Sequence, residues 1–355
     1  MHTLFEGVAS HHLQALLEYL IKDKKSFTLA QLNTILRTHK YSNSETKPSP
    51  INKDNDGSFH IKQTASQMMT LVRLFPFLCG NVEVENDKHW DCYLILLAIC
   101  DMACSFDVQE SDPTKFGWMV QVYLESFVTL YSPQFSVTPK MHYLVHLPKQ
   151  MTLFGPLRHH WCMRFESKNA QIKSFVTRCF RNVPLSVAIR HQQYLSYHLY
   201  TPPERHSSNF LYGGDQVSGD SQQFDHYREG IEKLLDIPNN SLFGIRCKFV
   251  IINGIEYKPG YVIRIKPTEP SYDFDYGLID AILMYEGHKI FLTTILEIKK
   301  FHKSLCAFEV SPTHNVKYVL YGSLYCHGVV HIHTKSGNLY IIEKNYCFKD
   351  LWCLF

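Results

Sequence analysis

Apolar residues recur at every third or fourth position through residues 9–130, which is the spacing of one face of an α-helix. Helices are therefore predicted over residues 9–21, 29–36, 64–75, 89–105 and 116–130. Pro76 and Pro133 are expected to end two of them, because proline lacks the N–H that a helix needs. Each helix has one apolar stripe and one polar face, so we expect a bundle. Residues 41–58 are polar and are interpreted as a surface loop.

From Leu242 onward apolar and polar residues alternate, which is typical of strands with one buried face. The pair Asn253-Gly254 between two apolar runs predicts a β-hairpin over residues 249–257. Further strands are expected over residues 261–265, 276–284, 289–298, 317–321, 329–333 and 339–342, with turns at 286–288 and 336–338. Short strands at this spacing favour a small antiparallel β-barrel.

Proline, serine, glycine and asparagine gather over residues 201–240, which indicates a surface linker around a short helix at 224–235. The linker separates the helical part of the chain from the strands. We therefore expect an α+β protein with a helical domain at 1–137, a distinct segment at 138–200 and a small β-barrel domain at 241–355.

The chain has 355 residues, a net charge of +3, and 45% hydrophobic and 14% aromatic residues, which is a globular composition. With so mild a charge, any nucleic-acid-binding surface must be local. Eleven cysteines without a Cys-x-x-Cys pair or a signal peptide indicate reduced thiols in an intracellular protein. No apolar run reaches the roughly 20 residues of a membrane span. Phosphate-binding glycine loops and nucleophile elbows are absent too.

Histidines raise a question of metal binding. His331 and His333 lie on the same side of a predicted strand, where an exposed polar face is the default reading and a metal site the alternative. A second set could bind zinc, because imidazole and thiolate suit that ion. Its members are His142, His146, His159, His160 and Cys162. Histidines that support a catalytic carboxylate or contact phosphate are the simpler interpretation of this set.

Glu166 follows a Gly-Pro break and an aromatic, basic run, at the start of a helix predicted to reach Arg181. Phe165 and Ile172 share one face of this helix, so we expect it to be half-buried. A carboxylate in a first turn complements the helix dipole and needs no function. Alternatively, Glu166 is a metal ligand whose basic neighbours hold a phosphate backbone, as two-metal phosphoryl transfer requires.

Several stretches carry a resemblance that favours the second reading. They are residues 139–148 (PKMHYLVHLP), 154–157 (FGPL), 161–166 (WCMRFE) and 190–192 (RHQ). Together they resemble the C-terminal part of transposases of the CACTA (En/Spm) superfamily. The opening residues 1–8 (MHTLFEGV) are similar to that family's Asp-x-Met-His-x-x-Phe-Glu-Gly signature. The resemblance covers residues 1–200 and keeps the family's order.

The resemblance implies a DDE-type transposase with a ribonuclease-H-like fold, in which two aspartates and a distant glutamate bind Mg²⁺ or Mn²⁺. Glu166 corresponds to that glutamate, as a catalytic and metal-binding residue, and His2 to the signature histidine that orients the site or a phosphate. Residues 138–200 then form the C-terminal segment of the catalytic core, and residues 1–137 resemble the helical insertion. Because the aspartates would stand upstream of Met1, we expect a fragment or remnant that binds metal and cleaves or joins DNA only with the full core. Whether this chain is an enzyme stays open.

DNA is the expected partner. Aromatic residues interleave with cations over residues 158–181, which suits single strands or distorted duplex ends. The expected phosphate contacts are Arg158, Arg164, Lys168, Lys173 and Arg178. The alternative is a non-catalytic module, domesticated from a transposon, that binds DNA, chromatin or protein, the latter through the β domain. Both readings predict an intracellular protein located in the nucleus.

Overall fold

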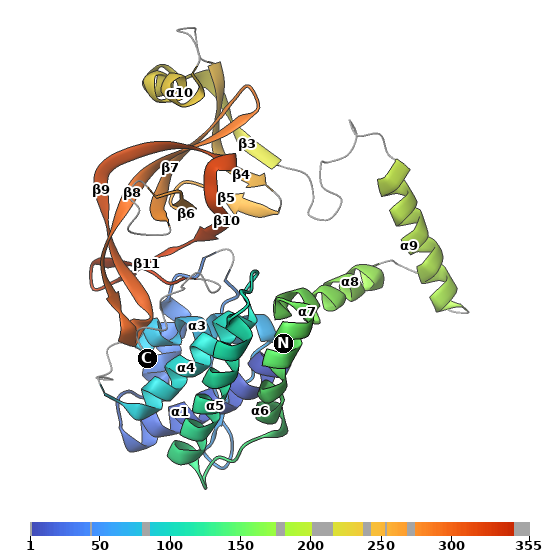
Figure 1. Cartoon of the computed structure of the whole chain (residues 1–355), viewed down its shortest axis with the longest axis vertical. Helices are drawn as coiled ribbons and strands as arrows, with labels where there is room; N and C mark the ends of the chain where they lie inside the picture. The colour runs from blue at the N-terminus through green and yellow to red at the C-terminus, as the bar shows by residue number, and fades with distance from the viewer. Residues whose placement is uncertain are drawn as a thin grey trace. The chain divides into compact units, whose positions relative to one another are not determined.

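The computed structural model describes residues 2–42, 45–79, 86–174, 182–200, 216–236, 243–252, 254–267 and 274–343. It divides into two compact units, each described here by itself. The first comprises Met1–Ser167, His302–Ala307 and Ile342–Phe355, and the second Lys168–Phe301 and Phe308–Ile341. Helices dominate the first unit and an antiparallel sheet the second (Figure 1). The mixed helix and sheet composition predicted from the sequence is therefore confirmed.

The helical unit begins with an uninterrupted helical stretch made of η1 (Leu4–Ala9), α1 (Ser10–Glu18) and η2 (Tyr19–Asp23). It continues through α2 (Leu29–Thr38), the short ladder β1 (Asn52–Lys53) and β2 (Phe59–His60), α3 (Ala65–Cys79), α4 (Lys88–Ala103) and α5 (Asp112–Tyr131). Next come α6 (Pro139–Tyr143), η3 (Leu144–His146), α7 (Leu147–Phe154), η4 (Leu157–His160) and the first residues of α8 (Met163–Ser174), which continues into the second unit from Lys168 onward. Helices α1, α4 and α5 lie side by side, so the predicted bundle forms (Figure 1).

A histidine lies at the centre of the bundle. His12 is fully buried, and its Nδ1 lies 3.0 Å from the hydroxyl of Tyr123. Four aromatic rings, those of Tyr93, Tyr123, Phe127 and Tyr131, have their centroids 5.4–5.6 Å from its own. Burial lowers the pKa of His12 to about 3, so the ring is neutral at physiological pH and serves as a core residue.

Pro76 does not end α3, contrary to the prediction, because the helix continues to Cys79. A proline at this position leaves the carbonyl of Val72, one turn earlier, without its usual N–H donor. The buried hydroxyl of Tyr93 on α4 donates to that carbonyl at 2.7 Å. A contact from another helix therefore satisfies the group that the proline leaves unpaired.

The sheet unit contains α9 (Val183–Tyr200), β3 (Gln216–Gln223), η6 (Asp225–Tyr227) and α10 (Arg228–Leu235). Its remaining strands are β4 (Phe243–Ile252), β5 (Ile255–Tyr257), β6 (Val262–Ile265), β7 (Asp275–Tyr285), β8 (His288–His302), β9 (Ala307–Leu320), β10 (Leu324–Val330), β11 (Ile332–Lys335) and β12 (Asn338–Ile341). The strand order is β10-β6-β7-β8-β9-β12-β11, and β4, which also pairs with β3 and β5, joins the far half of β7. The described strands form a curled, antiparallel half-barrel (Figure 1), so the predicted antiparallel sheet is confirmed.

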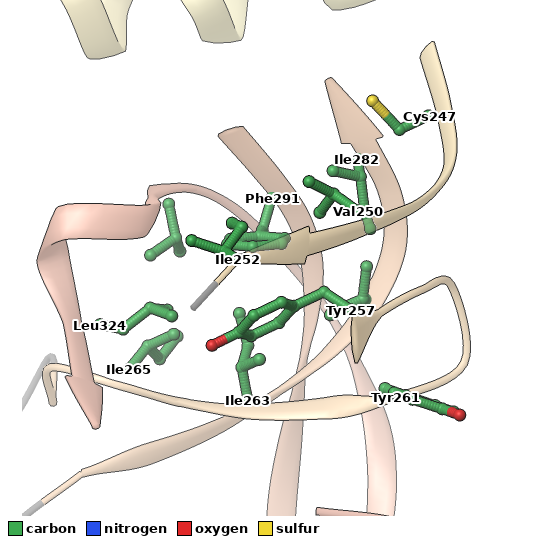
Figure 2. Packing of buried hydrophobic residues seen from close by; sticks show 12 residues of the cluster. Cys247, Val250, Ile252, Tyr257, Tyr261, Ile263, Ile265, Ile282, Phe291 and Leu324 are labelled. Carbon is green, nitrogen blue, oxygen red and sulfur yellow. The ribbon is translucent and has the colours of Figure 1, made fainter. Parts of the chain in front are cut away.

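Branched aliphatic and aromatic side chains fill the inside of the curl (Figure 2). Tyr257 is fully buried there, with its ring centroid 5.2 Å from that of Phe291. Its hydroxyl donates to the carbonyl of His327 at 2.7 Å. Ile263 and Ile265 of β6 lie beside this ring (Figure 2). Tyr257 thus joins the core to the backbone of β10 through one ring and one hydrogen bond.

Three tight turns lie where the sequence predicts them. Ile252 pairs with Ile255 across the expected hairpin, and Gly254 has φ 77°, while Asn253 lies outside the described residues. The other two turns contain the pairs Glu286-Gly287, with φ 47° and 81°, and Ser336-Gly337, with φ 51° and 84°. Two successive positive φ angles are those of the primed turn that matches strand twist.

Two expectations for this unit are wrong. Residues 216–223, part of the predicted linker, form strand β3 and pair with β4 along their whole length. His331 and His333 were expected on an exposed face, but only 6% and 4% of their surfaces are accessible. The ring of His331 lies edge-on to Tyr261, with 4.6 Å between centroids. The contact of His331 with Tyr261 comes from another part of the sheet unit, which alternation along a single strand cannot reveal.

We predict that Gly219→Ala weakens the attachment of β3. A Cβ at this position would lie 2.2 Å from the carbonyl oxygen of Arg246 and 2.7 Å from the Cα of Cys247, so the backbones must separate. We expect a loss of about 1–3 kcal/mol in urea unfolding, as for other overpacked sites. Gly322→Ala is the matched control, because nothing lies within 4 Å of its added Cβ. Equal stability of the two variants would contradict the close pairing of β3 with β4.

We also predict that Asp101 makes stability depend on pH. Burial raises the pKa of this α4 carboxyl from 3.8 to about 7, Glu343 adds to the rise, and Arg73 opposes it. The folded chain then holds a proton that the unfolded chain releases, so this contribution to stability falls as pH rises from about 4 to 7. Asp101→Asn should flatten that decline in melting temperature, whereas Asp107→Asn, an exposed control, should leave it unchanged.

Candidate functional site

The fold brings together the two residues that the sequence singles out for catalysis. His2 Nε2 lies 3.2 Å from Glu166 Oε1, and their side chains are 60% and 57% exposed. Cys162 joins them, since one ligand atom of each of the three residues lies within 4.8 Å of the others. Among the described residues this is the only group of three or more histidine, cysteine and acidic side chains close enough to share a metal ion.

Glu6 fixes the orientation of His2. The Nδ1 atom of His2 is hydrogen-bonded to Glu6 Oε2, one helical turn later, which leaves Nε2 facing Glu166. The hydrogen bond to Glu6 is the main cause that raises the pKa of His2, and the charges of Glu6 and Glu166 add to it. The imidazole lies between two carboxylates and is therefore protonated more readily than the imidazole of a free histidine.

A glycine lets η1 lie against α6. A Cβ on Gly7 would lie 2.1 Å from Cδ of Lys140, so only glycine leaves room for the lysine side chain to cross. The ammonium group of Lys140 donates to the carbonyl of Glu6 at 3.5 Å. Glu6 and Gly7 therefore have separate structural roles: one orients His2 and the other allows α6 to approach.

Arg158 holds the segment that leads into α8. Its guanidinium carbon lies 3.9 Å from the ring centroid of Phe106 and 4.6 Å from that of Trp161. Its Nη1 also donates to the carbonyl of Cys104, at the end of α4, at 3.2 Å. The sequence predicts a phosphate contact for Arg158, yet these partners give it a structural task next to the site.

Helix α8 presents Glu166 in its first turn, where the backbone N–H of Glu166 donates to the carbonyl of Cys162 at 2.9 Å. Both the helix dipole and His2 stabilise the carboxylate there. Phe165 is 74% exposed, so the expectation that it is buried and anchors the helix is wrong. Lys168 and Lys173 are exposed, and Lys168 lies 5.8 Å from the ring centroid of Tyr194. The Arg164 side chain, Arg178 and Arg181 lie outside the described residues.

The other histidines considered for zinc do not converge in the described part of the chain. His142 and His146 lie edge to face with 5.1 Å between centroids, and His160 Nε2 is hydrogen-bonded to the carbonyl of Phe154 at 2.8 Å. Cys162 lies near His2 instead. It also lines a cavity of about 260 Å³ together with Thr3, Phe154 and Trp161. No spacing rule could have paired Cys162 with His2, because the two come from distant parts of the sequence.

Comparison with family models, with curated proteins and with solved structures found no match for the chain. Any assignment of function therefore depends on the residues and geometry above. Among the described helices, none has the length and apolar character needed to cross a bilayer.

We predict that Arg158→Lys destabilises the helical unit although it keeps the charge. Lysine has no planar guanidinium that could stack on the two rings. We therefore expect the free energy of unfolding, measured with a chemical denaturant, to fall by about 1–2 kcal/mol. Arg37→Lys, on the exposed side of α2, is the control and should change stability by less than about 0.5 kcal/mol. If the two variants unfold alike, the ring contacts of Arg158 do not hold this segment.

Proposed function

We propose that the chain derives from a transposase of the CACTA (En/Spm) type and contributes His2 and Glu166 to a site that acts on a DNA strand. The supporting observation is the 3.2 Å approach of His2 Nε2 to Glu166 Oε1. Three of the stretches that carry the resemblance are residues 1–8, 139–148 and 161–166. His2 of the first stretch lies next to Glu166 of the third, and Lys140 of the second contacts the first through the carbonyl of Glu6. A ribonuclease-H-like ancestry of residues 138–200 and a nuclear location belong to the same proposal.

The charges around Glu166 suggest how this locality would receive a nucleic acid. Lys173 follows Glu166 by seven residues on α8, which places it on the same helical face about 10 Å further along the axis. When protonated, which the hydrogen bond to Glu6 favours by raising the pKa of His2, the imidazole would donate to a phosphate oxygen that comes close to Glu166.

The Mg²⁺ or Mn²⁺ ion implied by the resemblance does not fit the side chains described here. Mg²⁺ prefers six oxygen ligands in octahedral geometry, and Glu166 is the single hard oxygen donor of the set formed with His2 and Cys162. Carboxylates from two aspartates would be required to complete such a site. We therefore derive no cleavage step for this chain, and the proposal concerns origin, DNA binding and the role of Glu166.

A protein interaction module is the second candidate, because α9 has an exposed apolar stripe. Leu185, Ile189, Tyr197 and Tyr200 are 50–84% exposed and recur at helical spacing. Exposed apolar stripes of this kind often bind partner proteins. This function and DNA binding differ in their dependence on salt, because only phosphate contacts release condensed counterions.

We predict that the chain binds a duplex end with a single-stranded tail, and that its affinity falls as salt rises. Lys173→Ala should reduce the slope of log affinity against log salt by about one unit. Lys62→Ala removes the same charge from an exposed position before α3 and should leave the slope unchanged. Fluorescence anisotropy with a labelled oligonucleotide, in buffer without divalent metal, measures both.

Glu166→Gln should retain this DNA affinity, since removing a carboxylate removes no phosphate contact. A slope near zero, or equal slopes for Lys173→Ala and Lys62→Ala, would contradict the DNA-binding proposal and favour the protein interaction module.

A further inference from the structure

We infer that His2, Cys162 and Glu166 form a binding site for a zinc-class transition-metal ion. The inference depends on the geometry of these side chains alone, so it stands or falls independently of the transposase origin. It replaces the hard ion expected from the resemblance by a softer one. His2 lies two residues before η1, Cys162 immediately precedes α8, and Glu166 is in the first turn of α8.

The three ligand atoms are close to the spacing that such an ion needs. Zinc binds nitrogen and oxygen at about 2.0–2.2 Å and sulfur at about 2.3 Å in tetrahedral geometry, which places neighbouring ligand atoms about 3.5 Å apart. His2 Nε2 and Glu166 Oε1 are already 3.2 Å apart. All three atoms lie within 4.8 Å of one another. A change of the Cys162 rotamer that moves its sulfur by about 1 Å would therefore bring the sulfur within bonding distance of the ion.

Glu6 is the kind of hydrogen-bond partner that metal-binding histidines usually have. A histidine that binds metal through one nitrogen usually donates the other N–H to a carboxylate or carbonyl, which fixes the ring and its tautomer. Glu6 accepts from Nδ1 of His2 and so leaves Nε2 for the ion. Of the two carboxylates at His2, Glu6 orients the ring and Glu166 provides a ligand oxygen.

The chemistry of the donors selects the class of ion. Thiolate sulfur favours zinc, cobalt and similar ions over magnesium, and imidazole and carboxylate complete a set common to zinc sites. Three protein ligands leave the fourth tetrahedral position to water, which is the ligand number of catalytic rather than structural zinc sites. The exposure of His2 and Glu166 makes this position accessible from solvent.

Cobalt(II) titration of the full chain tests the inference, because a cobalt–thiolate bond produces a charge-transfer absorption that oxygen and nitrogen ligands do not. We expect one equivalent of Co²⁺ to give this band and Zn²⁺ to abolish it by displacement. A tenfold excess of Mg²⁺ should leave it unchanged. Cys162→Ser should remove the band, and His2→Ala and Glu166→Gln should each weaken Co²⁺ binding at least tenfold.

The controls are His159→Asn, an exposed histidine of η4, and Cys326→Ser, a half-buried thiol of the sheet unit. Both should keep the band. Zn²⁺ should raise the melting temperature of the unaltered chain but not of Cys162→Ser, because a ligand that binds only the folded state stabilises it. No band at one equivalent, an equal band in Cys162→Ser, or displacement of Co²⁺ by Mg²⁺ would overturn the inference. DNA affinity measured without metal does not affect this result.

Discussion

The guanidinium of Arg158 is the contact on which the geometry around Glu166 depends most. It lies between the rings of Phe106 and Trp161 and reaches the last turn of α4, so it fixes the chain just before Cys162. A charged group can be held this way because the ring faces are electron-rich and the carbonyl of Cys104 accepts its N–H. The opposite side of the site is held by steric fit, where the absent side chain of Gly7 makes room for Lys140. Two local contacts thus position residues that are far apart in the sequence.

The same arrangement bears on the metal that the resemblance implies. A nuclease site of the DDE type needs several carboxylate oxygens, whereas the described side chains supply one oxygen, one nitrogen and one sulfur. The resemblance concerns the position of Glu166 in the sequence and carries no information on the atoms that surround it. The preference for a soft or a hard ion and the coordination number depend on all the ligands together. They can be judged only when the fold brings His2 and Cys162 to Glu166.

Much of the secondary structure could be predicted from periodicity, because helices such as α2 and α5 bury one face. The Glu286-Gly287 turn was predictable for a similar reason, since its backbone angles restrict the residues allowed. Strand β3 was not, because it is polar and gives no burial pattern, and its pairing with β4 uses backbone groups together with an exposed ion pair between Asp220 and Lys248. The prediction that Pro76 ends α3 failed for another reason. The carbonyl that the proline leaves without a donor accepts from the hydroxyl of Tyr93, which belongs to α4. The proximity of His2 and Glu166 was implied by resemblance alone, and their pairing with Cys162 by nothing in the sequence.

Charge balance limits what a bound ion could do for DNA binding. Without metal, His2 lies between the carboxylates of Glu6 and Glu166, and the local charge is one negative unit when the imidazole is protonated. A zinc ion would require neutral His2 and the thiolate of Cys162, so its two positive charges would be offset and the local charge would again be one negative unit. The ion therefore adds no net attraction for a phosphate backbone. Attraction of the phosphate backbone must therefore come from lysines such as Lys173. The ion would act through its open coordination position on a group of the bound DNA that already lies close to it.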